Sequence, residues 1–536
     1  MLKLPKSVIS KAALLLTLTG GALLVACSDP GGAQLSVNSL LIQNITAIDA
    51  VHGMRENVDV LVIEGKIKTV GEHESIDVIT ADILEGTGKY IIPGLWDAHV
   101  HLAYSPEITY ETFFPLSLAY GITSLRDTGG HLDLLAPAIA AAASDAITPD
   151  LYISGPLIDG PLRVYAGQSA SNPDLSVGVT TAEEAKMMVD DLAAAGVNFV
   201  KAYEMLSPEA FKAAAAQARK HNLPVAAHIP LSMSVMEAIE AGANDMQHLR
   251  NIEFDCAANA KALKEERQKM LAVNDAESPA ALRGQIHSTM RALAIPQQDD
   301  LRCQAVIKAL SDANVYQTPT LVVSRFFSRK LFADERYRQS FDLMPQATAQ
   351  SWKDRSAKLD DYSVSAENAA FDDWVLSMIP RLRDGGVPIM VGTDAPIGFL
   401  TPGASLHEEL AELVSAGLSP LEAIGSATLV PAKFLKLDNE VGAISPNMRA
   451  DLVVLDENPL ENIRNINSIY AVIKGGHLLD RGRLVIYDHA PQETFGSPEY
   501  LNCLQNGSIF VRQNLLKSLI LLRKMVPPHG LEPRTP

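Results

Sequence analysis

The sequence predicts an α/β protein with a central (β/α)8 TIM barrel and a small composite β-sandwich domain built from both chain ends. Two observations predict this arrangement. Between residues 91 and 438, strand-like apolar segments alternate with helical patterns, as in successive βα units. Short strand-like runs broken by turns lie on either side, in residues 28–90 and 439–489. A chain of 536 residues is long enough for two domains.

Eight segments are predicted to form the strands of the barrel. They are Ile91–Leu102, Ile122–Asp127, Leu151–Ile158, Phe199–Glu204, Val225–Ile229, Asp245–Leu249, Tyr316–Val323 and Ile389–Asp394. Between them, Thr181–Ala195 begins with a Thr-x-x-Glu capping box and Ser207–His221 begins with Ser-Pro-Glu, a typical helix start. Eight βα units need about 250 residues. The longer span predicts insertions near 255–310 and 325–380, which form either lids over an active site or surface decoration.

The flanking segments have β-like patterns. Residues 40–84 contain alternating runs with Gly65 and Lys66 at a hairpin position. Near the other end, Asp451–Leu455 and Ile469–Ile473 are strand-like, and a further run covers Arg483–Ile486. We expect these segments to pair into one β domain. The tail, residues 490–536, fits neither domain, and its structure stays unknown.

The first 27 residues have the features of a bacterial lipoprotein signal peptide. Lysines precede an apolar run over residues 12–26, which is short for a membrane span and typical of an export signal. The run ends in Leu-Val-Ala-Cys27, which resembles a lipobox and implies lipidation of Cys27; plain signal cleavage near Ala26 is the alternative. We expect an exported protein that touches the membrane only through a lipid anchor. Ser28 favours the outer membrane, facing the periplasm or the cell surface.

Composition limits the partners. The formal net charge of −18 argues against a nucleic-acid partner, so we expect a small-molecule substrate, and the oligomeric state stays open. No C-x-x-C pair is present, which excludes a zinc finger. Cys256 and Cys303 flank the first predicted insertion. In an exported protein they can form a disulfide that closes it, or remain two buried thiols.

Potential metal ligands lie at the predicted strand ends, where reactive groups of such barrels are found. Strand one ends in Asp-Ala-His99-Val-His101, and residues i and i+2 of a strand face the same side. His99 and His101 are therefore expected to bind one metal ion together. His228 and His248 end strands five and six, and Asp394 ends strand eight, beside strand one once the barrel closes.

Strand four carries Lys201 within an apolar segment, where burial of a charge is costly. Lys201 is either half of an internal salt bridge or a residue carbamylated by carbon dioxide, which would make it an anionic bridging ligand. Tyr203, two residues later, faces the same side. Its hydroxyl either stabilises a developing oxyanion or serves only in packing.

These motifs resemble the metal-dependent amidohydrolase superfamily over about residues 40–485. The segments that carry the resemblance are IIPGLWDAHVHL, VKAYE, AAHI, MQHL, VGTDAP and SPLEAIGSATLVPAKFLKL with the following GAISPNMRADLVVLDENPL. Within the superfamily the chain is most similar to imidazolonepropionase-related and Xaa-Pro dipeptidase-like enzymes. The resemblance implies two divalent metal ions: His99, His101 and Asp394 bind the more buried ion, His228 and His248 bind the more exposed one, and carbamylated Lys201 bridges them.

The resemblance also implies a reaction. Two metal ions activate a water molecule, zinc being the first choice and manganese the second. Asp394 acts as general base and acid in hydrolysis of an amide-like C–N bond, in a dipeptide or an N-acyl amino acid. Substrate contacts are expected from Arg163 and Tyr165 after strand three and from His131 after strand two. Arg163 either holds a substrate carboxylate or is a solvated loop residue.

Other functions remain open at this point. A mononuclear deaminase on the same fold generally lacks the strand-four lysine and uses a glutamate near the strand-five histidine, yet Ile-Pro-Leu follows His228. Hydrolysis of a cyclic amide or a lactone is equally compatible with the motifs. A non-catalytic binding lipoprotein is the remaining alternative, although all six ligand types are present. Metal content per chain and hydrolysis assays distinguish these functions.

Overall fold

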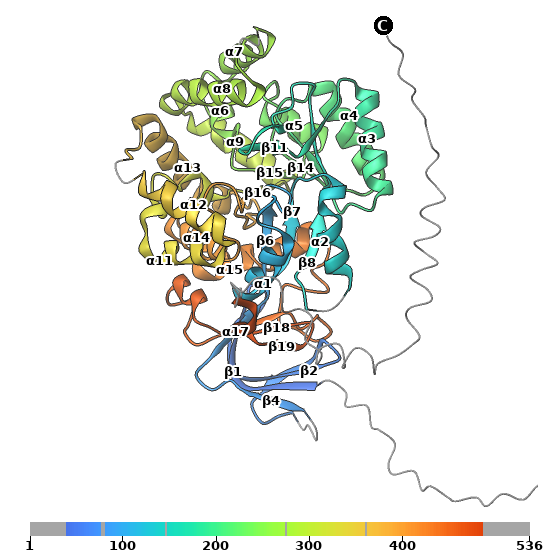
Figure 1. Ribbon diagram of the computed structural model, residues 1–536, viewed down its shortest axis with the longest axis vertical. Coiled ribbons are helices and arrows are strands. Elements are labelled where there is room, and N and C mark those ends of the chain that lie inside the picture. Colours follow the sequence, from blue (N-terminus) through green and yellow to red (C-terminus); the bar gives the residue numbers. More distant parts are fainter. Residues whose placement is uncertain (1–38, 77–80, 145–146, 274–275, 360–361, 486–536) are drawn as a thin grey trace, which may run out of the picture.

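The computed structural model describes residues 39–76, 81–144, 147–273, 276–359 and 362–485. The predictions for the signal segment, for lipidation of Cys27 and for the tail after residue 490 lie outside the described residues. In Figure 1, the β domain lies at one end of the molecule, and the helices α7 (Ala260–Val273) and α8 (Pro279–Ala294) lie at the opposite end. The barrel lies between them.

Parallel strands form the barrel, as predicted. In chain order they are β6 (Leu95–Val100), β7 (Ile122–Asp127), β8 (Asp150–Ile153), β9 (Leu157–Asp159), β13 (Val200–Ala202), β14 (Val225–Ala227), β15 (Asp245–Gln247) and β16 (Tyr316–Thr318). The predicted third strand is interrupted: β8 pairs with β7, whereas β9 pairs with β13. Together β8 and β9 occupy one position of the barrel and join its two sheets.

Residues 389–395 occupy the eighth position and close the barrel. Isolated parallel bridges pair Ile389 with Gln317 and Ala395 with Val100. Two backbone hydrogen bonds support this closure, from Ala98 N to Val391 O at 3.1 Å and from Asp394 N to His99 O at 2.7 Å. Asp394 has φ 69°, a backbone region that side chains rarely adopt. The predicted strand Ile389–Asp394 is therefore an irregular segment, joined to its neighbours by isolated bridges on both sides of Asp394.

The predicted first strand, Ile91–Leu102, is divided at Gly94. Its first part, β5 (Tyr90–Pro93), pairs with β17 (Leu452–Leu455) in the β domain, and β6 begins only after the glycine. A Cβ at Gly94 would lie 2.2 Å from Oγ1 of Thr123. Only glycine allows the chain to pass so close to β7 as it crosses from one sheet to the other.

Both chain ends contribute to one eight-stranded sheet, which confirms the composite β domain. Its order is β19-β18-β17-β5-β1-β2-β3, with β4 paired to β1. The strands not yet given are β1 (Ser39–Asp49), β2 (Gly53–Ile63), β3 (Lys66–Glu72), β4 (Asp82–Glu85), β18 (Ile469–Lys474) and β19 (His477–Leu479). Ile45, Val60, Leu452 and Ile473 belong to its fully buried core. The expected strand at Arg483–Ile486 is wrong, because Arg481–Val485 forms helix α17.

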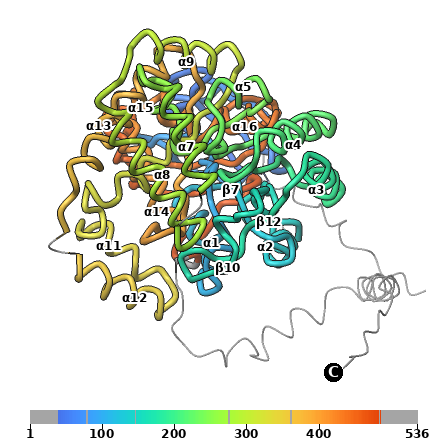
Figure 2. The backbone as a smooth tube through the Cα atoms, turned by 90° about the horizontal axis from the view of Figure 1, so that it is seen from above, coloured from blue at the N-terminus to red at the C-terminus, as the bar shows by residue number. Residues whose placement is uncertain are grey.

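Helices surround the barrel. They are α1 (Tyr110–Ala119), α2 (Leu132–Ser144), α3 (Ala182–Ala194), α4 (Pro208–Lys220), α5 (Val235–Ala241), α9 (Asp300–Asp312), α13 (Ala366–Asp384), α14 (Ala404–Ser415), α15 (Pro420–Ser426) and α16 (Leu429–Phe434). The predicted capping box is present at Thr181 and Glu184, and the Ser207 hydroxyl caps α4. Seen from above in Figure 2, α3 and α4 lie on one side, and α11 (Glu335–Arg338) and α12 (Gln346–Ala357) on the opposite side.

The first insertion is a helical unit closed by a disulfide. It contains α6 (Ile252–Asp255), α7, α8 and the short helix η1 (Ile295–Gln297). Cys256 and Cys303 are bonded, so of the two alternatives left open by the sequence the structure has the disulfide. Ala258 N donates to Gln297 O at 2.7 Å, and Asp299 N donates to Cys256 O at 2.8 Å. The base of the insertion is therefore joined both covalently and by backbone hydrogen bonds.

The second insertion begins earlier than predicted. Strand β16 ends at Thr318 instead of Val323, because Leu321 begins helix α10 (Leu321–Ser324). Arginines of this insertion form ion pairs with buried glutamates of α14: Arg336 with Glu408 at 3.0 Å, and Arg325 with Glu412. These pairs attach the insertion to the barrel. Among residues 39–485, outside the gaps given above, no helix is long and apolar enough to cross a membrane.

The closure of the barrel predicts the effect of a methyl group at Gly392. A Cβ there would lie 2.6 Å from the His99 Cβ and 2.8 Å from the Thr318 Cγ2, so Gly392→Ala must push the closing segment outward. We expect the free energy of unfolding to fall by about 1–3 kcal/mol in urea denaturation. Gly284→Ala is the control, since a Cβ at this position of α8 meets no atom within 4 Å. Equal stability of the two variants would contradict the tight closure.

Candidate metal centre

Three side chains predicted as ligands converge where the barrel closes. Nε2 of His99 and Nε2 of His101 each lie 3.1 Å from Oδ1 of Asp394. Their ligand atoms all lie within 4.8 Å of one another, and all three residues are buried. The two histidines end β6, and the carboxylate comes from the closing segment. This group has the composition and spacing of a site for one divalent metal ion.

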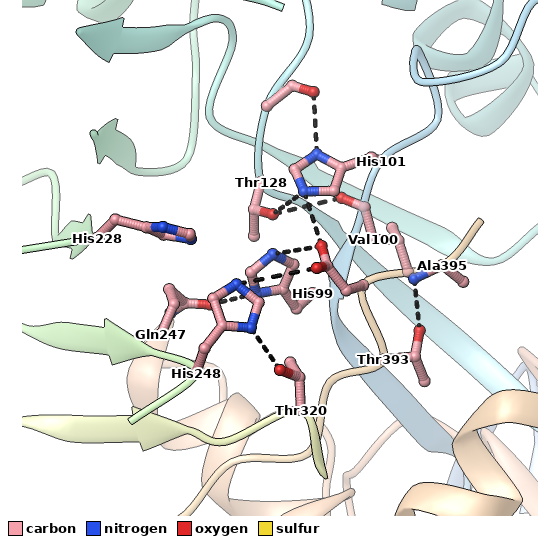
Figure 3. Close-up of polar contacts among 12 residues, drawn as sticks. His99, Val100, His101, Thr128, His228, Gln247, His248, Thr320, Thr393 and Ala395 are labelled. Carbon is pink, nitrogen blue, oxygen red and sulfur yellow. Dashed lines mark hydrogen bonds and ion pairs between the residues drawn. The ribbon is translucent and has the colours of Figure 1, made fainter. Parts of the chain in front are cut away.

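Two further imidazoles approach the same point from β14 and β15. Nε2 of His248 lies 3.9 Å from Oδ2 of Asp394. The rings of His228 and His248 are 4.7 Å apart, and those of His248 and His99 are 4.9 Å apart. Figure 3 shows His99, His101 and His248 gathered together, with His228 directed at them from the side. The structure therefore brings together all four predicted histidines.

Each of these imidazoles is held through its Nδ1 atom. The partners are the Gln247 side-chain oxygen for His99, the Gly129 carbonyl for His101 at 3.2 Å, the Glu204 carboxylate for His228 at 2.7 Å, and the Thr320 hydroxyl for His248. Such partners orient a ring and select its tautomer. Because Nδ1 is engaged in every case, Nε2 is the atom left to bind a metal ion.

The protonation states suit metal ligands. Burial lowers the pKa of His99 and of His228 to about 3, so both imidazoles are neutral at physiological pH. Burial opposes ionisation of Asp394, but the surrounding imidazoles outweigh it and hold the pKa of this carboxyl well below its usual range. Neutral imidazoles beside an ionised carboxylate are the forms that bind a cation.

Lys201, in β13, lies close enough that, besides burial, its charge lowers the pKa of His99, His228 and His248. Its side chain is fully buried, and among the described residues its Nζ has no hydrogen-bond partner. The salt bridge considered as an alternative for this lysine is therefore absent from the described part of the chain. Burial lowers the pKa of the Lys201 amine to about 7, which leaves a substantial neutral fraction. A neutral, unpaired amine is the form that reacts with carbon dioxide.

The residues present fit a bound metal. The amine of Lys201 is buried without a hydrogen-bond partner in the described residues. Orphaned buried polar atoms are rare and indicate a missing partner. The donors are imidazole nitrogens and carboxylate oxygens, a set that suits zinc and also manganese.

Tyrosine side chains border the exposed side of this group. The ring of Tyr203 stacks on His228 with centroids 4.5 Å apart, and Tyr165 meets Tyr203 edge-on at 5.7 Å. Burial raises the pKa of Tyr203 well above its usual value, so its hydroxyl stays protonated. Tyr203 thus lies beside the imidazole of His228, and Tyr165 lies against Tyr203.

The other two predicted substrate residues are engaged elsewhere. Arg163 Nη1 lies 2.9 Å and His131 Nε2 lies 3.3 Å from the same oxygen, Oδ1 of Asp174. Asp174 ends β11 (Asn172–Asp174), which forms a hairpin with β10 (Ala166–Ser169). Arg163 therefore forms an ion pair with Asp174, and this pair connects the β10–β11 hairpin to the loop that carries Arg163.

Comparison with known proteins assigns the family. The model of the amidohydrolase family matches residues 90–283 and 340–479, more than half of the chain. The protein belongs to the amidohydrolase family. The match covers every predicted metal ligand and leaves out residues 284–339, which contain the end of the first insertion and the beginning of the second. Both the recognition of this family from the motifs and the barrel with an added β domain are confirmed.

Solved structures similar to this amidohydrolase share its fold. A Xaa-Pro dipeptidase crystallised with methionine matches with a TM-score of 0.59 and 17% identity, over 83% of this chain and 100% of that one. A prolidase from Bifidobacterium longum matches with a TM-score of 0.57 and 22% identity, over 83% and 95%. Curated relatives match only short stretches: a dihydroorotase of Pelotomaculum thermopropionicum is 43% identical over 63 residues, 12% of this chain and 14% of its own length.

Several residues around the ligands of this amidohydrolase were not predicted. Gln247 directly precedes His248, and Glu204 directly follows Tyr203, so their positions beside strand ends could have indicated them. Thr320 holds His248 from the start of α10, a helix that the strand prediction had covered. Arg283 and His287 reach Glu204 from α8 in the first insertion, and no sequence signal connects them to the barrel.

A stability comparison tests whether Lys201 has a structural role. Because its amine is buried and unpaired, Lys201→Met is expected to keep or raise the free energy of unfolding, by up to about 4 kcal/mol. Lys474→Met is the matched control, since Lys474 pairs with Asp150 at 3.0 Å and Asp451 at 2.9 Å. Lys474→Met should lower the free energy of unfolding by at least about 1 kcal/mol, because both ion pairs are lost. The measurement is urea denaturation at pH 7 in metal-free, carbon-dioxide-free buffer, and equal losses would identify Lys201 as structural.

Proposed function

We propose that this protein is a binuclear metal-dependent hydrolase that cleaves an amide-like C–N bond in a dipeptide or an N-acyl amino acid. The observation that carries the proposal is the convergence of four imidazoles and an aspartate beside a buried, unpaired lysine. Stability alone does not account for this group, because burying the Lys201 amine without a partner is costly. The family and its prolidase-like structural neighbours support the same reaction class.

The ligands divide between two ions in the proposed site. His99, His101 and Asp394 would hold one ion, and His228 and His248 the other, with zinc as first choice and manganese as second. When bound, the two ions lower the pKa of a water molecule and polarise a substrate carbonyl. Lys201 would bridge them as a carbamate. Its neutral amine adds to the carbon of carbon dioxide and releases one proton, which leaves an anionic group with two oxygens.

The chain's own groups move the proton and stabilise charge. Asp394 is ionised and lies against three imidazoles, so it is placed to accept a proton from the attacking water and return it to the leaving nitrogen. The Tyr203 hydroxyl stays protonated and its ring stacks on His228, so the hydroxyl is proposed to donate to the oxyanion that develops at the carbonyl.

A cavity beside the ligands supports a small-molecule substrate. It has a volume of about 870 Å³ and is lined among others by Tyr104, Trp352, Arg355 and Ile397. Two hydrogen bonds connect its wall to the ligands: Tyr104 N donates to His101 O at 3.2 Å, and Ile397 N donates to Asp394 O at 3.0 Å. This volume is in the range of pockets for small organic ligands. The second insertion supplies one wall through α12 and so helps to select the substrate.

A second candidate is the hydrolysis of a cyclic amide. The match to a dihydroorotase, a protein named for a cyclic amide, favours it. A substrate panel should therefore contain dipeptides, N-acyl amino acids and cyclic amides. Wild-type protein that holds two metal ions and hydrolyses none of them would instead support a binding protein.

Replacement of Asp394 tests the proposed chemistry. Asp394→Asn keeps an oxygen ligand but removes the base, so kcat/KM for the best substrate is expected to fall about 10²–10⁴-fold while metal is retained. Activity is measured with the panel, and metal is counted per chain by mass spectrometry. Asp190→Asn is the control, because this exposed carboxylate pairs only with surface groups on α3 and α4. Full activity of Asp394→Asn would refute the assignment.

We also propose that the enzyme is exported and anchored to the cell envelope by a lipid on Cys27, in the outer membrane. The lipobox-like Leu-Val-Ala-Cys27 after an apolar run supports this. In a bacterial host, labelled palmitate should enter the wild-type chain but not Cys27→Ala, and the variant should leave the membrane fraction. Cys503→Ala is the control, and labelling that persists in Cys27→Ala would exclude the anchor.

A further inference from the structure

The buried carboxylate of Glu204 connects the first insertion to a predicted metal ligand. Glu204 follows β13 and is 1% exposed. Its Oε1 accepts hydrogen bonds from His228 Nδ1 and from Arg250 Nη1, both at 2.7 Å. Its Oε2 accepts one from His287 Nε2 at 2.7 Å and lies 3.1 Å from Arg283 Nε. One carboxylate therefore joins the imidazole of His228 to two side chains of α8.

The two α8 residues are placed to act together. Arg283 and His287 are four residues apart, so they project from the same face of the helix. The neighbouring face of α8 is apolar: Leu282, Ile286 and Met290 pack in a core with Phe254 of α6 and Leu263 of α7. Arg291, one turn further along, pairs with the buried Glu253 of α6 at 3.1 Å. The helix is therefore held rigidly while it presents Arg283 and His287 to Glu204.

The base of the insertion sets the position of α8. Cys256, at the end of α6, is bonded to Cys303 in α9, and backbone hydrogen bonds join residues 256–258 to 297–299. Through these links a unit of about fifty residues has its two ends fixed to the barrel helices. The contacts at Glu204 therefore connect the disulfide-closed insertion, through α8, to His228.

The buried position of the Glu204 carboxylate explains why it needs these partners. An ionised carboxylate that is almost fully buried is unfavourable unless donors surround it. Donors from four side chains surround Glu204: Arg250, Arg283, His228 and His287. As the partner of His228 Nδ1, the Glu204 carboxylate orients this imidazole and leaves Nε2 to bind a metal ion. Partners of this kind commonly change metal affinity 10–100-fold.

We propose that the disulfide-closed insertion, residues 256–303, is a brace that positions His228, with His287 and Arg283 as positioning residues for the more exposed metal ion. This inference rests on the proposed binuclear site. The brace acts on one of the two ions only, because the other three imidazoles have partners from the barrel itself and from α10. Loss of the brace should therefore weaken binding of the more exposed ion and leave binding of the more buried ion unchanged.

The test measures zinc binding to the metal-free full chain by equilibrium dialysis at fixed free zinc, with cobalt(II) absorption to identify the site. Wild type should hold two ions. His287→Leu should bind the second, more exposed ion 10–100-fold more weakly, and it should bind the first, more buried ion normally. His287→Gln, which keeps a donor near the position of Nε2, should recover most of the loss. His221→Leu is the control, because His221 is an exposed histidine that pairs with Asp190 at 2.6 Å.

Each outcome has a separate meaning. Wild type that never binds a second ion overturns the proposed binuclear function itself. Wild type with two ions and an unchanged second affinity in His287→Leu overturns the brace and leaves the function intact. Retention of the first ion shows that His287→Leu is folded. If that variant fails to fold, Arg283→Met and the double variant Cys256→Ala/Cys303→Ala decide, since each should weaken the second ion alone, and normal binding in both rejects the brace.

Discussion

The site depends on the contact that closes the barrel, between residues 97–101 and 391–395. Asp97 holds this contact: its carboxylate accepts hydrogen bonds from Thr393 N at 3.0 Å and from the Thr393 hydroxyl at 2.6 Å. The contact joins the first and last strand positions, which lie about 300 residues apart in sequence. Because Asp394 N donates a backbone hydrogen bond to His99 O across it, the same bonds that complete the fold bring the imidazoles to the carboxylate.

Polar groups behind the ligands complete this arrangement. Gln247, Glu204 and Thr320 come from different strand ends, yet each holds an Nδ1 atom and turns Nε2 toward the centre. Most of these partners belong to the barrel, where parallel strands fix their positions. Glu204 differs, because half of its own donors come from an insertion. The common scaffold and an added helical unit thus meet at a single carboxylate.

Much of this could be predicted from the sequence, and for a physical reason. Strand alternation determines which side a residue faces, and barrel topology places all carboxyl ends at one rim, so His99, His101, His228 and Lys201 could be located. The docking of α8 could not, since an amphipathic helix does not reveal which surface its polar residues meet. Arg163 likewise had a partner, Asp174, on a hairpin that the sequence did not indicate. The division of the first strand at Gly94 depended on a contact with Thr123 in the neighbouring strand.

Because the β domain combines segments from both chain ends, its sheet can be completed only late in synthesis. Strand β5 lies between β1 and β17, so the sheet is continuous only after residues 452–455 have been synthesised. Until then, β1 to β5 present unpaired backbone groups and apolar side chains, a situation that favours aggregation. Pairings of such high sequence separation also form slowly. The early strands must therefore be shielded while the whole barrel is translated, and a chain truncated before β17 would lack a partner for this edge.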